Sequence, residues 1–128
     1  MSDEPKWLIY DAIIALHHQG IKQFGGKAGT KDKGSLEIAI ERPFNKWQYG
    51  TGDLHTIAAA YAYGLIKNHP FHDGNKRIAL NACFLFLRLN GAQFTTSEET
   101  AYLMTDGLAS GEVTEEEFSS WLQSITLE

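Results

Sequence analysis

The amino-acid sequence predicts an all-α protein, a compact bundle of about six helices that forms a single domain over residues 1–128. Two observations predict this class. Apolar residues recur at helical spacing along most of the chain, and capping residues or glycines separate the periodic stretches. A composition of 43% hydrophobic and 21% charged residues suits one domain with one sizeable core.

The first half of the chain predicts three helices. They are expected over residues 6–24, 35–42 and 54–68. The first ends at Gly25, and a glycine-rich, exposed loop follows it. The second should stop before Pro43, because the residue before a proline disfavours helical geometry. The segment 43–53 suits either an exposed flap or a small β-hairpin, and Asp53 is a good N-cap for the third helix.

The second half predicts three more helices, and the first of these lies at the centre of the domain. They are expected over residues 76–89, 97–108 and 114–125. The stretch 76–89 is apolar nearly all round, which is typical of a buried helix. Asn90-Gly91 should end it, with a short extended piece before Ser97. Ser97 and Thr114, each followed by acidic residues, are start signals for the last two helices.

The loop between the third helix and the buried helix carries the candidate chemistry. Residues 69–77 read His-Pro-Phe-His-Asp-Gly-Asn-Lys-Arg. This places a base, a carboxylate, a glycine and two cations at a helix N-terminus, where free N–H groups and the helix dipole favour an anion. Two cations there oppose the dipole unless an anion binds between them. Because phosphoryl transfer uses these groups, the loop predicts a phosphate site.

Each polar residue of the loop has an expected role in that chemistry. His69 suits the removal of a proton from an attacking hydroxyl near neutral pH. Asp73, the sole carboxylate of the loop, suits Mg²⁺ held together with substrate phosphates. The phosphates are expected at Gly74, Asn75, Lys76 and Arg77. Asn75 either donates to the anion or caps the turn, and Asn81, one helical turn after Arg77, either extends the site or caps a backbone group.

A transition-metal site is a competing interpretation of the loop. The three possible ligands are His69, His72 and Asp73. Pro70 between the histidines, and the absence of a partner cysteine or a second histidine cluster in the sequence, weaken that interpretation. We therefore place zinc or iron below phosphate. His17 and His18 are expected on the surface of the first helix.

Charge and cysteine usage limit the class of partner. A formal net charge of −5 argues against direct nucleic-acid binding, which depends on clustered Lys and Arg. Cys83, the single cysteine, lies in an apolar run and predicts a buried thiol in a reducing compartment. No apolar run reaches the ~18 residues of a membrane span, and the start lacks the order of a signal peptide. We expect a cytoplasmic protein without a membrane partner.

These residues resemble a known family. The string His-Pro-Phe-x-Asp-Gly-Asn-Lys-Arg over 69–77 is similar to the signature loop of Fic-domain proteins. Its Asn-Lys-Arg ending, with Ile-Ala-Leu-Asn after it, resembles the death-on-curing (Doc) branch of that superfamily. Further segments that resemble Doc-type sequences are 24–26, 36–37, 42–43 and 85–91. The resemblance covers almost the whole chain and implies an all-α Fic fold with the loop at the N-terminus of a central helix.

The resemblance implies a transferase that uses ATP and Mg²⁺. General Fic enzymes transfer AMP to a target hydroxyl, with the loop histidine as base, the acidic residue on Mg²⁺, and glycine and arginine positions on the phosphates. This chain departs from them twice: Lys76 replaces their second glycine and Leu80 their second arginine. Both changes should alter how the nucleotide sits, so that a different phosphorus faces the hydroxyl.

Doc-type toxins share the lysine, and the resemblance therefore implies a toxin kinase. Such toxins are understood to transfer the ATP γ-phosphate to a Ser/Thr hydroxyl of elongation factor Tu and so to block translation. The C-terminal segment of an antitoxin folds into a groove and inhibits them. Gly74 departs from the Doc prototype, which has alanine there. The alternatives are an AMP transferase, a catalytically silent partner-binding module and, last, a metal-dependent hydrolase.

Overall fold

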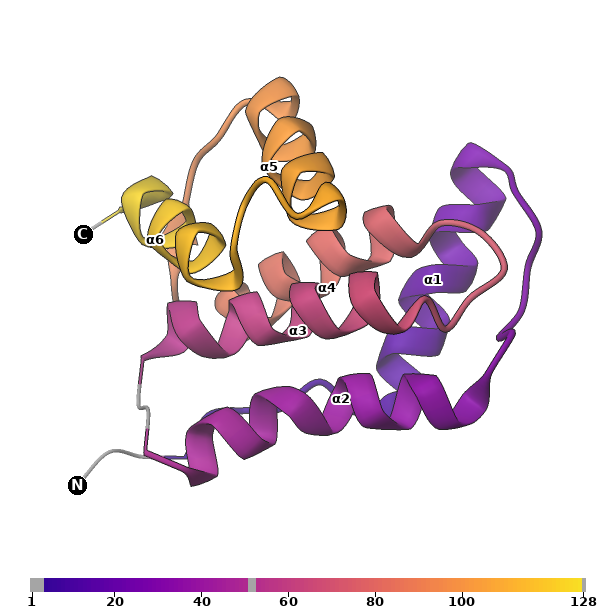
Figure 1. The fold of residues 1–128 in the computed structure, drawn as a ribbon, viewed down its shortest axis with the longest axis horizontal. Coiled ribbons are helices and arrows are strands. Elements are labelled where there is room, and N and C mark those ends of the chain that lie inside the picture. The colour runs from indigo at the N-terminus through magenta and orange to yellow at the C-terminus, as the bar shows by residue number, and fades with distance from the viewer. Residues whose placement is uncertain (1–3, 51–52, 128) are drawn as a thin grey trace.

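Six α-helices and one two-stranded sheet form the described part of the chain, residues 4–50 and 53–127, in this computed structural model (Figure 1). The all-α class is confirmed. The elements are α1 (Tyr10–Phe24), α2 (Lys33–Gln48), α3 (Leu54–Asn68), α4 (Asn75–Leu89), β1 (Gln93–Phe94), α5 (Glu98–Ser110), α6 (Glu115–Ile125) and β2 (Thr126–Leu127). Strands β1 and β2 pair in an antiparallel manner.

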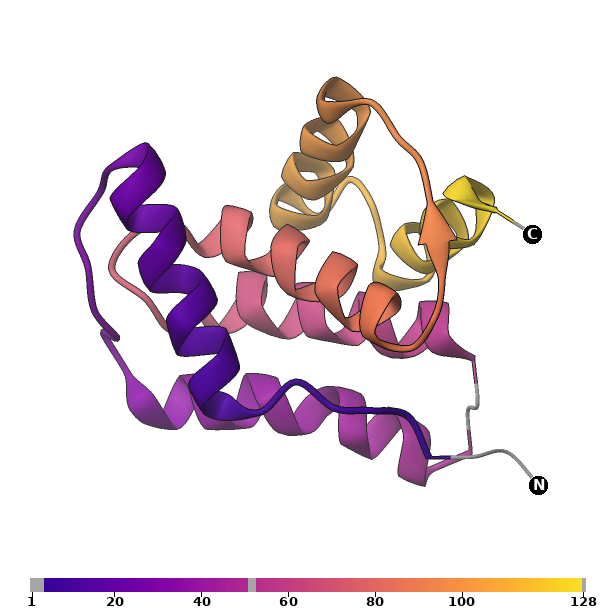
Figure 2. The ribbon, with the colours of Figure 1, turned by 180° about the vertical axis from the view of Figure 1, so that it is seen from behind.

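Helices α3 and α4 lie side by side at the centre of the bundle, and the other helices cover them (Figures 1 and 2). Helix α2 packs on α3, α1 crosses α4, and α5 and α6 close the other side. Helix α3 is rich in buried alanine, which lets its neighbours approach closely. The burial predicted for α4 is confirmed. Its thiol, Cys83, is fully buried, and burial raises the pKa of that thiol.

The capping signals in the sequence mark the helix starts. The Asp53 carboxylate accepts a hydrogen bond from the His55 backbone N–H at 3.0 Å, where α3 begins. Ser97 caps α5 in the same way, and Thr114 forms a reciprocal capping box with Glu117 at the start of α6. The predicted starts of these helices are therefore confirmed to within one residue.

Helix α1 begins at Tyr10, so the prediction that it starts at residue 6 is wrong. The preceding backbone is held by side chains of the central helices instead of by helical hydrogen bonds. The Leu8 N–H donates to the Tyr61 hydroxyl at 3.0 Å, and the Lys6 N–H donates to the Asn90 amide oxygen at 2.8 Å. Burial raises the pKa of Tyr61 to about 12, against the opposing effect of the Leu8 N–H.

Helix α2 continues through Pro43 to Gln48, so the predicted stop before Pro43 is wrong. Proline lacks the N–H that would bond the Ala39 carbonyl four residues earlier. That carbonyl lies where α2 meets α3, opposite Gly64, at which an added Cβ would come within 3.1 Å of the oxygen. Pro43 is buried on the face of α2 that also buries Leu36 and Ala39. Tertiary packing of this face keeps α2 helical although one hydrogen bond is missing.

The hairpin alternative for segment 43–53 is also wrong wherever the structure describes that segment. Residues 43–48 belong to α2, and a turn follows at 49–50. Residues 51–52 lie outside the described part. Aromatic spacing alone did not reveal the helix, because the expected break at Pro43 divided its pattern. None of the described helices has the length and apolar character needed to cross a bilayer.

Candidate active site

The loop between α3 and α4 holds its conformation through two residues in left-handed backbone geometry. His69 ends α3 with φ 50° and ψ 52°, and it is the one non-glycine residue with positive φ in the described ranges. Gly74 precedes α4 with φ 77°. A left-handed conformation costs a residue with a side chain about 1–2 kcal/mol, and at His69 this conformation ends α3 and turns the chain into the loop.

The loop is anchored to the segment that follows α1. Pro70 and Phe71 are buried, and Phe71 forms an isolated antiparallel bridge with Thr30 in the segment after α1. The Pro70 carbonyl accepts hydrogen bonds from the N–H groups of Lys31 at 2.7 Å and Asp32 at 3.1 Å. The exposed residues of the loop therefore project from a fixed backbone.

Asn75 uses its side chain within the loop. Its amide nitrogen donates to the Phe71 carbonyl at 2.9 Å, and its amide oxygen accepts from the Phe71 N–H at 3.0 Å. The residue is only 5% exposed. Of the two roles predicted for Asn75, its side chain takes the turn-stabilising one, and the backbone N–H in the first turn of α4 is the group that can meet an anion.

Asp73 presents an exposed carboxylate, and two groups from the α1 side hold this residue, one at its side chain and one at its backbone. The Lys27 N–H donates to Asp73 Oδ2 at 2.6 Å, and the His17 ring contacts the Asp73 carbonyl oxygen with Nε2 at 2.7 Å. His17 is only 5% exposed, so the prediction that it lies on the helix surface is wrong, whereas His18 is exposed as predicted. His17 shares the buried face of α1 with residues four before and four after it.

The two cations of the loop point to opposite sides of the α4 N-terminus. Lys76 Nζ lies 3.1 Å from Asp106 Oδ1 of α5, in an exposed ion pair. The Arg77 guanidinium lies 4.4 Å from the centre of the Phe24 ring of α1. The Arg77 Nε atom is buried and has no hydrogen-bond partner among the described residues. An anionic oxygen that reached it would supply the acceptor that this group lacks.

A cavity lies on each side of the loop's helix. The His69 cavity, about 260 Å³, is lined by His69, Lys76, Asn75, Lys67, Ile66 and Ala109. The Arg77 cavity, about 350 Å³, is lined by Arg77, Asn81, Leu80 and four aromatic residues. Those aromatic residues are Phe24, Phe84, Phe94 and Tyr102. The shared face predicted for Arg77 and Asn81 is confirmed, and it supports the interpretation that Asn81 extends the site.

The donor set suits magnesium better than a transition metal. Among the described residues, no three side chains of His, Cys, Asp or Glu gather as metal ligands. Asp73 provides one exposed carboxylate next to a helix N-terminus, and Mg²⁺ is commonly held by one or two carboxylates together with substrate phosphates. Asp73 is therefore the residue of the loop that could hold such a cation.

Comparison with known proteins now decides the family. Residues 7–87 match the sequence model of the Fic/DOC family. The chain belongs to the Fic/DOC family. It is 41% identical over 104 residues to "Protein kinase doc" of Escherichia phage P1, covering 80% of this chain and 82% of that one. It is also 40% identical over 73 residues, 55% of each chain, to "Toxin Doc" of Mycolicibacterium smegmatis (strain ATCC 700084 / mc(2)155). The all-α bundle is thus the Fic fold.

Proposed function

We propose that this Fic/DOC protein is a toxin kinase that transfers the γ-phosphate of ATP to a Ser/Thr hydroxyl of a translation factor. The position of Lys76 carries this proposal: it lines the same cavity as His69, so a phosphate that it binds lies beside the expected base. The relatives named as a protein kinase and as a toxin support the same activity. The family resemblance indicates elongation factor Tu as the target and the cytoplasm as the place of action.

The two cavities favour one direction for the nucleotide. We place the nucleoside in the Arg77 cavity, because its aromatic walls suit a base and its volume of about 350 Å³ is the larger. The phosphates then cross the N-terminus of α4, past Arg77 and the N–H groups of Gly74 and Asn75. The γ-phosphate ends beside Lys76 and His69. AMP transfer needs the nucleoside's own phosphate at His69, whose cavity has no aromatic residue among its described lining.

The reaction then follows from the residues in place. His69 takes the proton of the target hydroxyl, and the oxygen of that hydroxyl forms a bond to the γ-phosphorus. The bond from that phosphorus to the bridging oxygen breaks, and ADP leaves with the electron pair. Lys76 and the helix N-terminus stabilise the charge on the phosphate oxygens. Asp73 is the residue that would hold Mg²⁺, which neutralises phosphate charge when bound.

A groove along α2, α3 and α6 is the proposed antitoxin site. Two adjoining cavities of about 690 and 550 Å³ share Lys46, Thr56, Tyr63 and Lys67 on their walls. Each of these two cavities has a larger volume than either cavity of the loop, and the groove mixes apolar and charged side chains, as a helix-binding groove does. We propose that the C-terminal segment of an antitoxin folds into it, in keeping with the relative named as a toxin.

Intact-mass measurement tests the activity. The full chain, ATP, Mg²⁺ and elongation factor Tu are incubated, and a mass gain of about 80 Da on the target is expected for phosphate. A gain of about 329 Da would show AMP transfer instead and overturn the kinase proposal. His69→Ala should lose at least about a hundredfold in rate, because general-base catalysis contributes that much. No nucleotide turnover by the wild type, with partner binding retained in a His69→Ala, Asp73→Ala double mutant, would favour a silent binding module.

A further inference from the structure

We propose that His17 is a positioning residue that fixes Asp73, the predicted Mg²⁺ ligand, from the α1 side. The inference depends on the proposed function, because it concerns the group assigned to the metal. His17 lies outside the loop and 56 residues before Asp73 in the chain. It holds the loop through its ring. It lines neither the His69 cavity nor the Arg77 cavity, but a small cavity of about 10 Å³ between α1 and α4, together with Gly74 and Arg77.

The His17 ring is fixed by two contacts with the loop. It stacks on Phe71, with 3.7 Å between ring centres and 10° between ring planes. Its Nε2 lies 2.7 Å from the Asp73 carbonyl oxygen. A carbonyl oxygen only accepts, so Nε2 carries the hydrogen and donates it. The stack sets the ring plane, and the hydrogen bond then sets the direction of the Asp73–Gly74 peptide.

The segment after α1 holds the carboxylate of the same residue. The Lys27 N–H donates to Asp73 Oδ2 at 2.6 Å, which leaves Oδ1 as the oxygen for a cation. His17 and Lys27 therefore hold Asp73 at its backbone and at its side chain, from one helix and the loop that follows it. Groups that orient a metal ligand in this way commonly contribute 10- to 100-fold to metal affinity.

Two glycines pack closely against Asp73 and His17. A Cβ added at Gly26, whose φ is 113°, would lie 3.1 Å from the Asp73 Cβ. One added at Gly74 would lie 3.5 Å from His17 Nε2. Both glycines thus lie in contact range of the His17–Asp73 pair. Without the His17 donor, the Asp73–Gly74 peptide loses the hydrogen bond that sets its direction. We therefore expect the Asp73 carboxylate to lose its fixed orientation as well.

The test compares variants that separate the donor from the ring. His17→Met removes both, His17→Phe keeps a ring against Phe71 but removes the donor, and His17→Gln keeps a donor near the Nε2 position. His18→Ala, on the exposed side of the same helix, is the matched control. For each full-length variant, affinity is measured for Mn²⁺–ATP by electron paramagnetic resonance and for ATP in EDTA. Hydrogen exchange of the Lys27 amide is measured in metal-free protein, after thermal unfolding has shown that the variant folds.

The ratio of the affinity for Mn²⁺–ATP to the affinity for ATP in EDTA separates a change in metal binding from general damage to the fold. His17→Met and His17→Phe should lower that ratio about tenfold and speed Lys27 exchange, His17→Gln should stay within about threefold of wild type, and His18→Ala should match it. An unchanged ratio with unchanged Lys27 exchange in the donor-free variants would overturn the inference. Wild-type protein that binds no Mn²⁺–ATP would instead overturn the proposed function, and Lys27 exchange alone would then decide the coupling of His17 to Asp73.

Discussion

At the scale of single residues, Asn75 stabilises the loop between α3 and α4 through its side-chain hydrogen bonds. Its side chain satisfies both the N–H and the carbonyl of Phe71, which are buried. We expect Asn75→Ala to lower the free energy of unfolding by about 2–6 kcal/mol, because it leaves two buried groups unpaired and each costs about 1–3 kcal/mol. Urea denaturation followed by circular dichroism measures this change.

An exposed asparagine provides the control for that substitution. Asn45→Ala, on the solvent side of α2, should change the free energy of unfolding by no more than about 0.5 kcal/mol. An Asn75→Ala protein as stable as Asn45→Ala would show that the loop does not depend on the amide. The two predicted roles of Asn75 would then be open again.

The sequence located the loop residues but not the residues that hold them. His69 through Arg77 are contiguous, so their chemistry could be identified without knowing the fold. His17, Lys27 and Asp106 reach the loop from elements distant in the chain, and no local pattern identifies that contact. For His17 one signal was present: it lies midway between Ile13 and Ile21, at the spacing of a buried face.

At the scale of helices, the sequence predicted the capped helix starts. It did not predict where tertiary packing keeps a helix together against local propensity. The expected range 54–68 coincides with the observed α3, because Asp53 marks its start and the motif loop follows its end. The predicted end of α2 is wrong because the low helix propensity of Pro43 does not take account of packing against the neighbouring helix. The close approach at Gly64 and the buried face of α2 are tertiary features, which the local sequence does not encode.

Gly64 tests that explanation of the α2–α3 contact. Alanine usually stabilises a helix interior relative to glycine, by about 0.5–1 kcal/mol. At Gly64 the added Cβ would lie 3.1 Å from the Ala39 oxygen and 3.2 Å from the Ala39 Cα, which are backbone atoms of α2. Because overpacking costs about 1–3 kcal/mol, we expect Gly64→Ala to destabilise the protein by about 1 kcal/mol or more in thermal unfolding.

Gly20 is the matched helical glycine with room for a methyl group. A Cβ there would lie 3.5 Å from the Arg77 Cδ, an ordinary contact with a side chain. Gly20→Ala should therefore raise the free energy of unfolding by about 0.5–1 kcal/mol. Equal effects of the two substitutions would show that the distance between α2 and α3 adjusts freely, and the account of Pro43 would fail.

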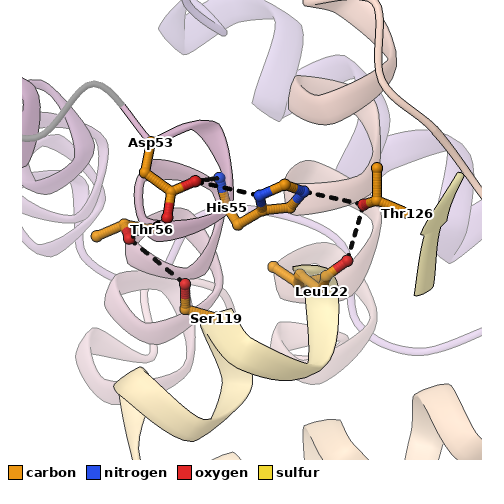
Figure 3. Close-up of polar contacts among 6 residues, drawn as sticks. All are labelled: Asp53, His55, Thr56, Ser119, Leu122 and Thr126. Carbon is orange, nitrogen blue, oxygen red and sulfur yellow. Dashed lines mark hydrogen bonds and ion pairs between the residues drawn. The ribbon is translucent and has the colours of Figure 1, made fainter. Parts of the chain in front are cut away.

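At the scale of the whole molecule, a polar cluster joins the start of α3 to the C-terminal end of the described chain (Figure 3). The His55 ring bridges Asp53 Oδ1 at 3.1 Å and the Thr126 hydroxyl at 2.9 Å, and the Thr126 hydroxyl donates to the Leu122 carbonyl. The Thr56 hydroxyl donates to Asp53 Oδ2 at 3.0 Å. This cluster joins α6 and β2 to α3, at the end of α3 away from the α3–α4 loop.

Asp53 makes the stability of that closure depend on pH. Burial raises its pKa, but hydrogen bonds from the His55 N–H, the Thr56 hydroxyl and the His55 ring outweigh burial, so the pKa of Asp53 is lowered from its ordinary 3.8. As the pH falls below 3.8, Asp53 of the unfolded chain binds a proton while Asp53 of the folded chain stays ionised. The contribution of Asp53 is therefore complete above pH 3.8 and is lost as the pH falls toward the lowered value.

Urea denaturation between about pH 6 and pH 3 measures this contribution. Wild-type stability should fall most steeply below the ordinary pKa of Asp53. Asp53→Asn keeps a capping side chain but does not titrate, so its slope against pH should be shallower. Thr56→Val removes one of the bonds that lower the pKa and should give an intermediate slope. Equal slopes in all three proteins would show that the cluster around Asp53 does not hold its carboxylate ionised in the fold.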